Sequence, residues 1–354
     1  MHALVKIAIG ALAALGAAGP GLADDLVKVR FGTNWLAEAE HGGYYQAVAD
    51  GTYKKYGLDV EIVQGGPQAP NQQLLAAGKI DFYMGGTLGV FDAEKNGIPL
   101  IDVGAIFQKD PQILMAHPDA GYKTFADLAK APTIFLGKDV FTTEFQWMKA
   151  TYPGFHDSQY KPYTFNPGPF IVDKLSVQQG YVTSEPYAVQ KAVQAAYDDC
   201  KAKGNADCPP AWKPQVFLFA DAGYDDYANT IETTQDMVKN KPEVVQKFVD
   251  ASIIGWYTYL YGDNSAANAL IKKDNPDMTD DQIAFSINAM KESGIALSGD
   301  AMTKGIGCTT DARYEDFFNK LVKAKLEPAD FDYKTAYTNQ FVCKGVGMDL
   351  APKQ

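Results

Sequence analysis

The chain has 354 residues, of which 46% are hydrophobic and 21% are charged, and its formal net charge at neutral pH is −11. Arginine occurs only at Arg30 and Arg313, and the sequence has no cluster of basic residues. Nucleic acids and anionic membrane surfaces are bound through such clusters, so both are excluded as partners.

The N-terminal residues have the features of a secretory signal peptide. Lys6 precedes an apolar stretch of small residues at 7–18, and Gly21-Leu22-Ala23 provides a small-x-small cleavage site. The stretch is too short for a membrane-spanning helix. We therefore expect residues 1–23 to be removed and the mature protein to be soluble and periplasmic; the alternative is a loosely ordered tail. No cysteine lies near the cleavage site, so we expect no lipid anchor.

The remaining chain, residues 24–354, is longer than a single hydrophobic core usually supports, so we expect two lobes. Its first part alternates strands and helices, which is the pattern of βαβ units and a parallel sheet. We predict strands over residues 27–31, 58–63, 80–84 and 100–107, and helices starting near 40–42, over 71–77 and after Thr87. In such a sheet, ligands bind outside the carboxyl ends of the strands.

The chain is predicted to cross to a second lobe near residues 108–116 and to return near residues 221–232. Lobe 1 then comprises residues 24–111 and 221–354, and lobe 2 comprises residues 112–220. In lobe 2 we predict strands over 132–136, 160–165, 180–183 and 215–220, and helices from Thr124, over 142–150 and over 186–203. The returning chain is predicted to be helical over 242–261, 265–273, 279–293 and 311–323. The predicted fold is α/β, with two lobes of parallel-rich sheets flanked by helices and a ligand cleft between them.

Four cysteines lie at positions 200, 208, 308 and 343. An even number in an exported chain indicates disulfides, and four cysteines allow three connectivities. We favour Cys200–Cys208 and Cys308–Cys343, because each bond closes a local loop. The alternative is a metal site, but no Cys-x-x-Cys occurs and the histidines are scattered, so no metal is expected.

Several motifs near the start of the mature chain resemble a known family. They are Trp35, His41-Gly42-Gly43-Tyr44-Tyr45, Gly51, Tyr56-Gly57-Leu58-Asp59-Val60 and Gly65-Gly66-Pro67, followed by Gly85-Gly86-Thr87, Thr183-Ser184-Glu185-Pro186 and Gly255-Trp256. Together they resemble periplasmic solute-binding proteins of the nitrate/sulfonate/taurine class, and within it the branch that binds pyrimidine precursors of thiamine. The resemblance implies a two-lobed, type II-like periplasmic binding protein. The resemblance identifies the class of protein more specifically than the ligand, because this architecture serves many ligands.

Candidate ligand-binding residues in lobe 1 lie at strand ends and helix starts. Trp35 can stack on an aromatic ligand, as the resemblance implies, or can be a core residue. His41 can donate to a ligand or cap the turn, and Tyr44, one turn later, can face a ligand or the core. Gly86 and Thr87 can hold an acceptor atom through backbone amides and the hydroxyl, or can simply cap a helix.

In lobe 2 the candidates are Asn166, in a turn, and Glu185, which begins a helix. The Glu185 carboxylate can accept hydrogen bonds from the amino groups of an aminopyrimidine, or can be a first-turn residue favoured by the helix dipole. Because phosphates and sulfonates are usually gripped by Arg forks, the scarcity of Arg favours a neutral or amino-bearing ring.

The leading hypothesis is therefore a monomeric binding component of an ABC importer that hands a small-molecule ligand to a membrane permease, without a cofactor. Alternative ligands of the same fold are nitrate, sulfonates, taurine, flavins and aromatic acids. An enzyme resembling a pyrimidine synthase is disfavoured, since that enzyme's cysteine-rich iron site is missing and its pyridoxal phosphate is intracellular. A third hypothesis is a receptor that presents its ligand to a membrane sensor.

Overall fold

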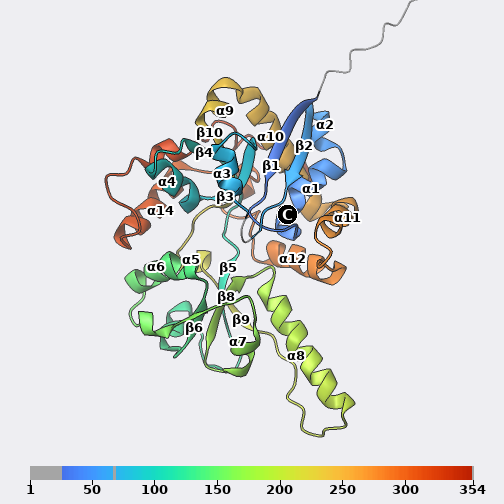
Figure 1. Cartoon of the computed structure of the whole chain (residues 1–354), viewed down its shortest axis with the longest axis vertical. Helices are drawn as coiled ribbons and strands as arrows, with labels where there is room; N and C mark the ends of the chain where they lie inside the picture. The colour runs from blue at the N-terminus through green and yellow to red at the C-terminus, as the bar shows by residue number, and fades with distance from the viewer. Residues whose placement is uncertain (1–25, 67–68, 353–354) are drawn as a thin grey trace, which may run out of the picture.

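Two mixed sheets organise the computed structural model, which describes residues 26–66 and 69–352. Figure 1 shows each sheet inside its own lobe, with helices around it. The expected signal peptide, residues 1–23, and Pro67 of the motif that follows the second strand lie outside the described residues.

The first sheet has the strand order β2-β1-β3-β10-β4. Its strands are β1 (Val27–Gly32), β2 (Leu58–Val63), β3 (Phe82–Gly86), β4 (Leu100–Phe107) and β10 (Ala228–Thr234). β1 pairs in parallel with β2 and β3, whereas β10 runs antiparallel between β3 and β4. The late strand β10 thus completes a sheet whose other strands come from the first part of the chain.

The second sheet repeats this design, with the order β7-β6-β8-β5-β9. Its strands are β5 (Gln112–Ala116), β6 (Ile134–Leu136), β7 (Tyr160–Pro162), β8 (Val177–Tyr181) and β9 (Gln215–Leu218). β6 pairs in parallel with β7 and β8, and β5 runs antiparallel between β8 and β9. The predicted α/β fold with two lobes is confirmed.

Helices flank both sheets. They are α1 (Gly42–Ala49), α2 (Thr52–Lys55), α3 (Asn71–Ala76), α4 (Thr87–Lys95), α5 (Lys138–Thr142), α6 (Glu144–Thr151), α7 (Gly168–Val172), α8 (Glu185–Ala202), α9 (Gln235–Asn240), α10 (Pro242–Tyr261), α11 (Ser265–Asp274), α12 (Asp280–Glu292), α13 (Ala301–Lys304) and α14 (Asp311–Lys323). The long C-terminal helices match their predicted ranges closely. The capping box predicted at Thr124 starts a 3-10 helix, Phe125–Lys130, in which Asp127 and Thr124 bond reciprocally. No helix of the described residues is both long and apolar enough to cross a membrane.

The crossings between the lobes are shorter than predicted. Residues 112–116 form β5, and residues 228–234 form β10, so only residues 108–111 and 219–227 connect the sheets. β10 was not predicted because its sequence, Ala-Asn-Thr-Ile-Glu-Thr-Thr, is mostly polar, although nearly all of it is buried. Its interior position, between β3 and β4, comes from pairing with strands far away in sequence, which local patterns do not show.

Close helix packing explains the glycines of the first motif. A Cβ at Gly43 would lie 2.2 Å from the Trp256 ring, and a Cβ at Gly255 would lie 2.2 Å from the carbonyl oxygen of Gly43. These glycines therefore allow α1 to lie directly against α10. Phe248 of α10 stacks on Phe82 of β3 with ring centroids 4.1 Å apart, which joins the helix pair to the sheet.

Both predicted disulfides are present. Cys200–Cys208 joins the end of α8, which projects from lobe 2 in Figure 1, to the loop that follows it. Cys308–Cys343 joins the segment beside β4 to the C-terminal segment. All four cysteines of the sequence are therefore paired.

Candidate functional site

A cavity of about 500 Å³ lies between the two sheets. Trp35 follows β1, Gly86 ends β3 and Tyr181 ends β8, and all three line it. The cavity is thus at the carboxyl ends of strands from both lobes, where an open α/β sheet binds ligands. Asp110 and Pro111, which belong to the first crossing, form another part of its wall.

Two aromatic rings from different lobes meet at this cavity. Trp35 comes from lobe 1 and Phe165, just after β7, comes from lobe 2; their ring centroids are 6.1 Å apart and their planes are inclined by 35°. The Trp35 carbonyl oxygen accepts hydrogen bonds from the Thr33 hydroxyl at 2.8 Å and from the Gly65 amide at 3.1 Å. A Cβ at Gly65 would lie 2.3 Å from the Thr33 carbonyl oxygen, so this glycine of the family motif allows the Trp35 loop to fold as it does.

The cavity is strongly acidic. Among the described residues that line it there are six carboxylates and no Lys, Arg or His; the carboxylates are Glu38, Glu40, Asp110, Asp139, Glu185 and Glu232. Burial raises the pKa of Asp110 to about 6 and that of Glu232 to about 7. Burial, and then repulsion by Glu40 and Glu185, raises the pKa of Glu38. A cavity of this kind suits a ligand that brings positive charge or several hydrogen-bond donors.

The side chain of Glu232, on β10, lies over the end of β3. Its carboxylate accepts hydrogen bonds from the Gln72 side-chain amide at 3.1 Å and from the Gly86 backbone amide at 3.3 Å. A Cβ at Gly85 would lie only 1.7 Å from Glu232 Oε1. The Gly85-Gly86 pair therefore gives this carboxylate both its space and a donor.

Glu185 has the corresponding arrangement in lobe 2. Its Oε2 accepts hydrogen bonds from the Tyr181 amide and the Ser184 hydroxyl, each at 2.7 Å. A Cβ at Gly180 would lie 2.5 Å from the Glu185 Cβ. The residue is thus the first residue of α8 and also lines the cavity, a position compatible with both roles that the sequence left open.

Four of the seven predicted site residues do not line the cavity: His41, Tyr44, Thr87 and Asn166. Each of them instead makes hydrogen bonds within the structure around it. Burial lowers the pKa of His41 to about 3, so its ring is neutral; Nδ1 accepts from the Glu38 amide at 3.3 Å, and Nε2 therefore donates to Asn34 Oδ1 at 3.1 Å. His41 thus caps the turn that presents two lining residues, Asn34 and Glu38.

The other three are also placed by local or core contacts. The buried hydroxyl of Tyr44 donates to Asn229 Oδ1 at 2.7 Å, and that of Thr87 donates to the Tyr227 carbonyl at 3.1 Å. Asn166 Oδ1 accepts from the Gly168 amide at 2.9 Å, at the start of α7. Its neighbour Phe165 is the residue of this turn that reaches the cavity.

Sequence reasoning missed most of the acidic residues. Glu38 and Glu40 precede α1 in the unusual run Glu-Ala-Glu-His, which was a usable signal. Glu232 and Asp110 offered none, because one lies in an unpredicted strand and the other in a crossing. Among the described residues, no group of three or more His, Cys, Asp or Glu side chains is arranged to hold a metal ion.

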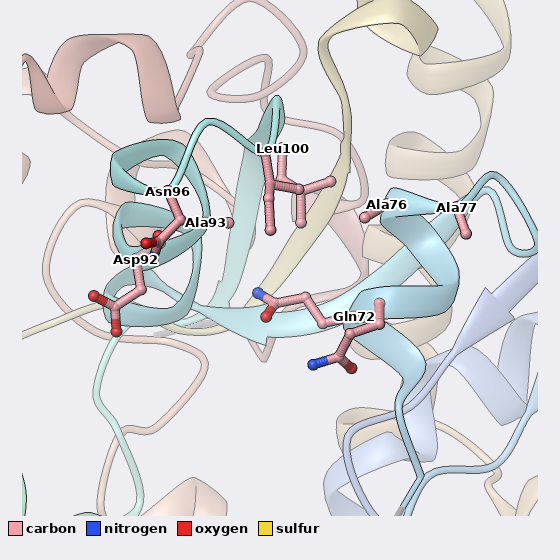
Figure 2. A pocket seen from close by; sticks show the side chains of 9 residues that line it. Gln72, Ala76, Ala77, Asp92, Ala93, Asn96 and Leu100 are labelled. Atoms are coloured by element: carbon pink, nitrogen blue, oxygen red, sulfur yellow. The ribbon is translucent and has the colours of Figure 1, made fainter.

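A second hollow, of about 420 Å³, lies between α3 and α4 of lobe 1 (Figure 2). Its lining includes Gln72, Ala76, Ala93 and Leu100, and its carboxylate, Asp92, forms an ion pair with Lys95 at 2.7 Å. None of the predicted site residues lines it, so the cavity between the lobes is the candidate site.

The sequence matches the family model described as NMT1/THI5 like over residues 38–264. It is 24% identical over 351 residues to the riboflavin-binding protein RibY of Chloroflexus aurantiacus, covering 95% of this chain and 92% of RibY. A putative thiamine biosynthesis protein of Haemophilus influenzae is 25% identical over 101 residues, which are 28% of this chain and 32% of that protein.

Among solved structures, the periplasmic aliphatic sulphonate binding protein SsuA from Escherichia coli has a TM-score of 0.60 at 13% identity, covering 87% of this chain and 91% of SsuA. This similarity shows that the fold is that of the two-lobed periplasmic binding proteins. Because the family match spans more than half of the residues, the chain belongs to the NMT1/THI5-like family.

Proposed function

We propose that this protein is the extracytoplasmic solute-binding component of an ABC importer and that its ligand is a small planar ring carrying amino groups or a positive charge. The observation that carries the proposal is the cavity with six lining carboxylates and no basic side chain among its described lining residues. Amino groups donate to carboxylates, and a positive charge offsets the mutual repulsion of buried acids.

Two buried polar atoms support a ligand at this position. Glu40 Oε1 and Gln112 Nε2 have no hydrogen-bond partner within the described part of the chain, and both residues line the cavity. A buried polar atom without a partner is unfavourable by roughly 1–3 kcal/mol. A ligand that offers a donor to Glu40 and an acceptor to Gln112 would remove this penalty, and an aminopyrimidine has both kinds of group.

Anionic ligands fit this cavity poorly. The two arginines of the sequence lie elsewhere: Arg30 pairs with Glu61 at 3.3 Å on the surface, and Arg313 contacts the crossings between the lobes. A sulfonate or nitrate would meet carboxylates instead of the Arg fork that usually holds such groups. The sulphonate bound by the structural relative SsuA is therefore not expected to bind here.

Within planar rings, an aminopyrimidine that is a precursor of thiamine is the first candidate. The resemblance of the family motifs and the name of the Haemophilus influenzae relative support it. Riboflavin is the second candidate, supported by the relative RibY and by the aromatic pair Trp35 and Phe165. The acidic lining favours the pyrimidine, because a neutral flavin brings no positive charge to six carboxylates.

We propose binding rather than catalysis, because the cysteines that an iron site of the alternative enzyme would need have structural roles here. All four cysteines form disulfides, so none is left as a thiolate to hold iron. The disulfides also fit an oxidising compartment, which supports export to the periplasm.

Titration calorimetry with an aminopyrimidine, riboflavin and an alkanesulfonate tests the proposal. We expect the aminopyrimidine to bind and the sulfonate to give no heat of binding. The variant Glu61→Gln, which changes an exposed carboxylate outside the cavity, is the control and should bind like the wild type. Tight binding of the sulfonate would overturn the proposed ligand class, and binding of riboflavin alone would establish the second candidate.

A further inference from the structure

Phe165 combines two unfavourable features at the edge of the cavity. Its side chain is 69% exposed, and its backbone is in the left-handed region with φ of 57°. Left-handed backbone is rare for a bulky non-glycine residue, and such strain persists where the surrounding structure enforces it, often at ligand contacts. Neither feature is expected of a Phe whose role is to fill a core.

The turn after Phe165 explains how this conformation is maintained. Pro167 and Pro169 restrict their own backbone angles, and Asn166 accepts a hydrogen bond from Gly168 at 2.9 Å. α7 begins at Gly168, so the turn is anchored to a helix whose Phe170 is fully buried. The restrained turn therefore fixes the backbone from which the exposed ring projects.

The ring of Phe165 is directed toward the other lobe. Its aromatic neighbours are Trp35 of lobe 1, with centroids 6.1 Å apart, and Tyr163 of its own lobe, with centroids 5.3 Å apart. A flat ring inserted between two others needs a separation of about 7 Å, since stacked atoms approach to about 3.5 Å on each side. The present gap is within about 1 Å of that value, and a small rotation of the lobes would open it and align the planes.

We propose that Phe165 and Trp35 form a two-lobe aromatic clamp that selects flat ligands, with Phe165 as the specificity-determining residue contributed by lobe 2. The inference rests on the proposed function, because it names the shape that the same cavity selects. Carboxylates attract positive charge of any shape, whereas two facing rings favour a planar π-system. The clamp would therefore distinguish an aromatic amine from an aliphatic amine of equal charge.

The test uses two variants and three ligands. Phe165→Asn removes the ring but tolerates left-handed backbone, and Phe165→Tyr keeps the ring. Affinities for an aminopyrimidine, riboflavin and an aliphatic diamine are measured by titration calorimetry, and the melting temperature of each ligand-free variant is measured to establish folding.

We expect Phe165→Asn to weaken binding of the flat ring by about 5- to 150-fold, the range for loss of one stacking partner. Its affinity for the diamine should match that of the wild type, its melting temperature should be equal or higher, and Phe165→Tyr should bind normally. If Phe165→Asn binds the ring as tightly as the wild type, the clamp is wrong and the proposed function stands. An equal loss for ring and diamine also overturns the clamp. If the wild type binds neither flat ring, the clamp and the proposed function both fall.

Discussion

Glu232 lies so close to Gly85 that no side chain can be added there: a Cβ at position 85 would be 1.7 Å from Glu232 Oε1. The two residues come from neighbouring strands, β10 and β3, of which one is late and the other early in the chain. The glycine therefore determines where the Glu232 carboxylate is placed in the cavity.

Gly85→Ala should displace that carboxylate. We expect the free energy of unfolding to fall by about 1–3 kcal/mol, as for other overpacked sites, and the affinity for an aminopyrimidine to fall as well. Denaturant unfolding and titration calorimetry measure the two effects. Gly86→Ala is the matched control for stability, because its Cβ would meet no atom within 4 Å. An equal loss of stability in both variants would show that the contact with Glu232 is not the cause.

Glu185→Gln tests one of the two lining acidic residues of lobe 2, Asp139 and Glu185. The variant keeps the shape and an oxygen for the Tyr181 amide and Ser184 hydroxyl, but it loses the charge. A hydrogen bond to a charged group contributes about 1.5–3 kcal/mol, so affinity for an aminopyrimidine should fall roughly 10- to 150-fold. The exposed Glu61→Gln serves as control. Wild-type affinity in Glu185→Gln would remove Glu185 from the ligand contacts.

Ligand affinity should depend on pH through the lining acids whose pKa is raised. Asp110 and Glu232, with pKa values of about 6 and about 7, are protonated at pH 5 and lose their protons as the pH rises. Affinity for a ligand of constant positive charge should therefore increase from pH 5 to pH 8, and binding near pH 6.5 should release protons. Calorimetry in two buffers of different ionisation enthalpy counts those protons. Glu232→Gln should release fewer, and an affinity that declines with rising pH would contradict the acidic site.

The raised pKa of Glu232 should make the ligand-free protein less stable as the pH rises, whereas ligand affinity should increase. The pKa of Glu232 in the native protein lies above its ordinary value of 4.5, so the native state binds this proton more tightly than the unfolded state does. The free energy of unfolding of the ligand-free protein should therefore decrease as the pH rises from about 4.5 to about 7. Glu232→Gln removes this contribution, and denaturant unfolding at pH 5 and pH 7 should show a smaller difference than in the wild type.

Arg313 joins the two crossings. Its guanidinium, on α14, donates to the carbonyl oxygens of Gln108, Asp225 and Asp226 and lies 4.1 Å from the centroid of the Tyr227 ring. Arg313→Lys keeps the charge but loses the planar fork, so we expect a lower free energy of unfolding by about 1–3 kcal/mol. Identical stability of Arg313→Lys and the wild type would exclude this role.

The two lobes, residues 24–111 with 221–354 and residues 112–220, are expected to close on the ligand. Small-angle scattering of the wild type should therefore show a larger radius of gyration without ligand than with saturating ligand. Identical scattering in the two states would contradict this closure.

The two disulfides should differ in their contribution to stability. Cys308–Cys343 closes a loop with a sequence separation of 35 residues, whereas Cys200–Cys208 spans 8. Loop-closure entropy then predicts a loss of about 4 kcal/mol for the first pair and about 2.5 kcal/mol for the second when both cysteines are replaced by Ala. Thermal unfolding of the two double variants measures the difference, and a larger loss for the pair at the end of α8 would contradict the entropic account.

The local sequence was sufficient to predict those features of the protein that arise from interactions between residues close together in the chain. The ranges of α10 and α14, the capping box at Thr124 and the pairing of nearby cysteines follow from periodicity, caps and short loops. The place of Trp35 at the cavity was predicted because this residue follows a strand whose carboxyl end had to face the ligand side of a parallel sheet; its contact with a ligand stays a prediction.

The tertiary structure alone decided the chemistry of the cavity. Its carboxylates come from the loop after β1, a crossing, α5, α8 and β10, and no local pattern links these segments. The same holds for β5 and β10, whose interior positions in the sheets depend on partners distant in sequence. His41 and Tyr44 were weaker candidates than Trp35, and they face inward, where they bond to Asn34 and Asn229. The physical reason is that the direction of a side chain, and the charge around it, are set by which segments pack together, whereas a sequence pattern reports only the periodicity of its own segment.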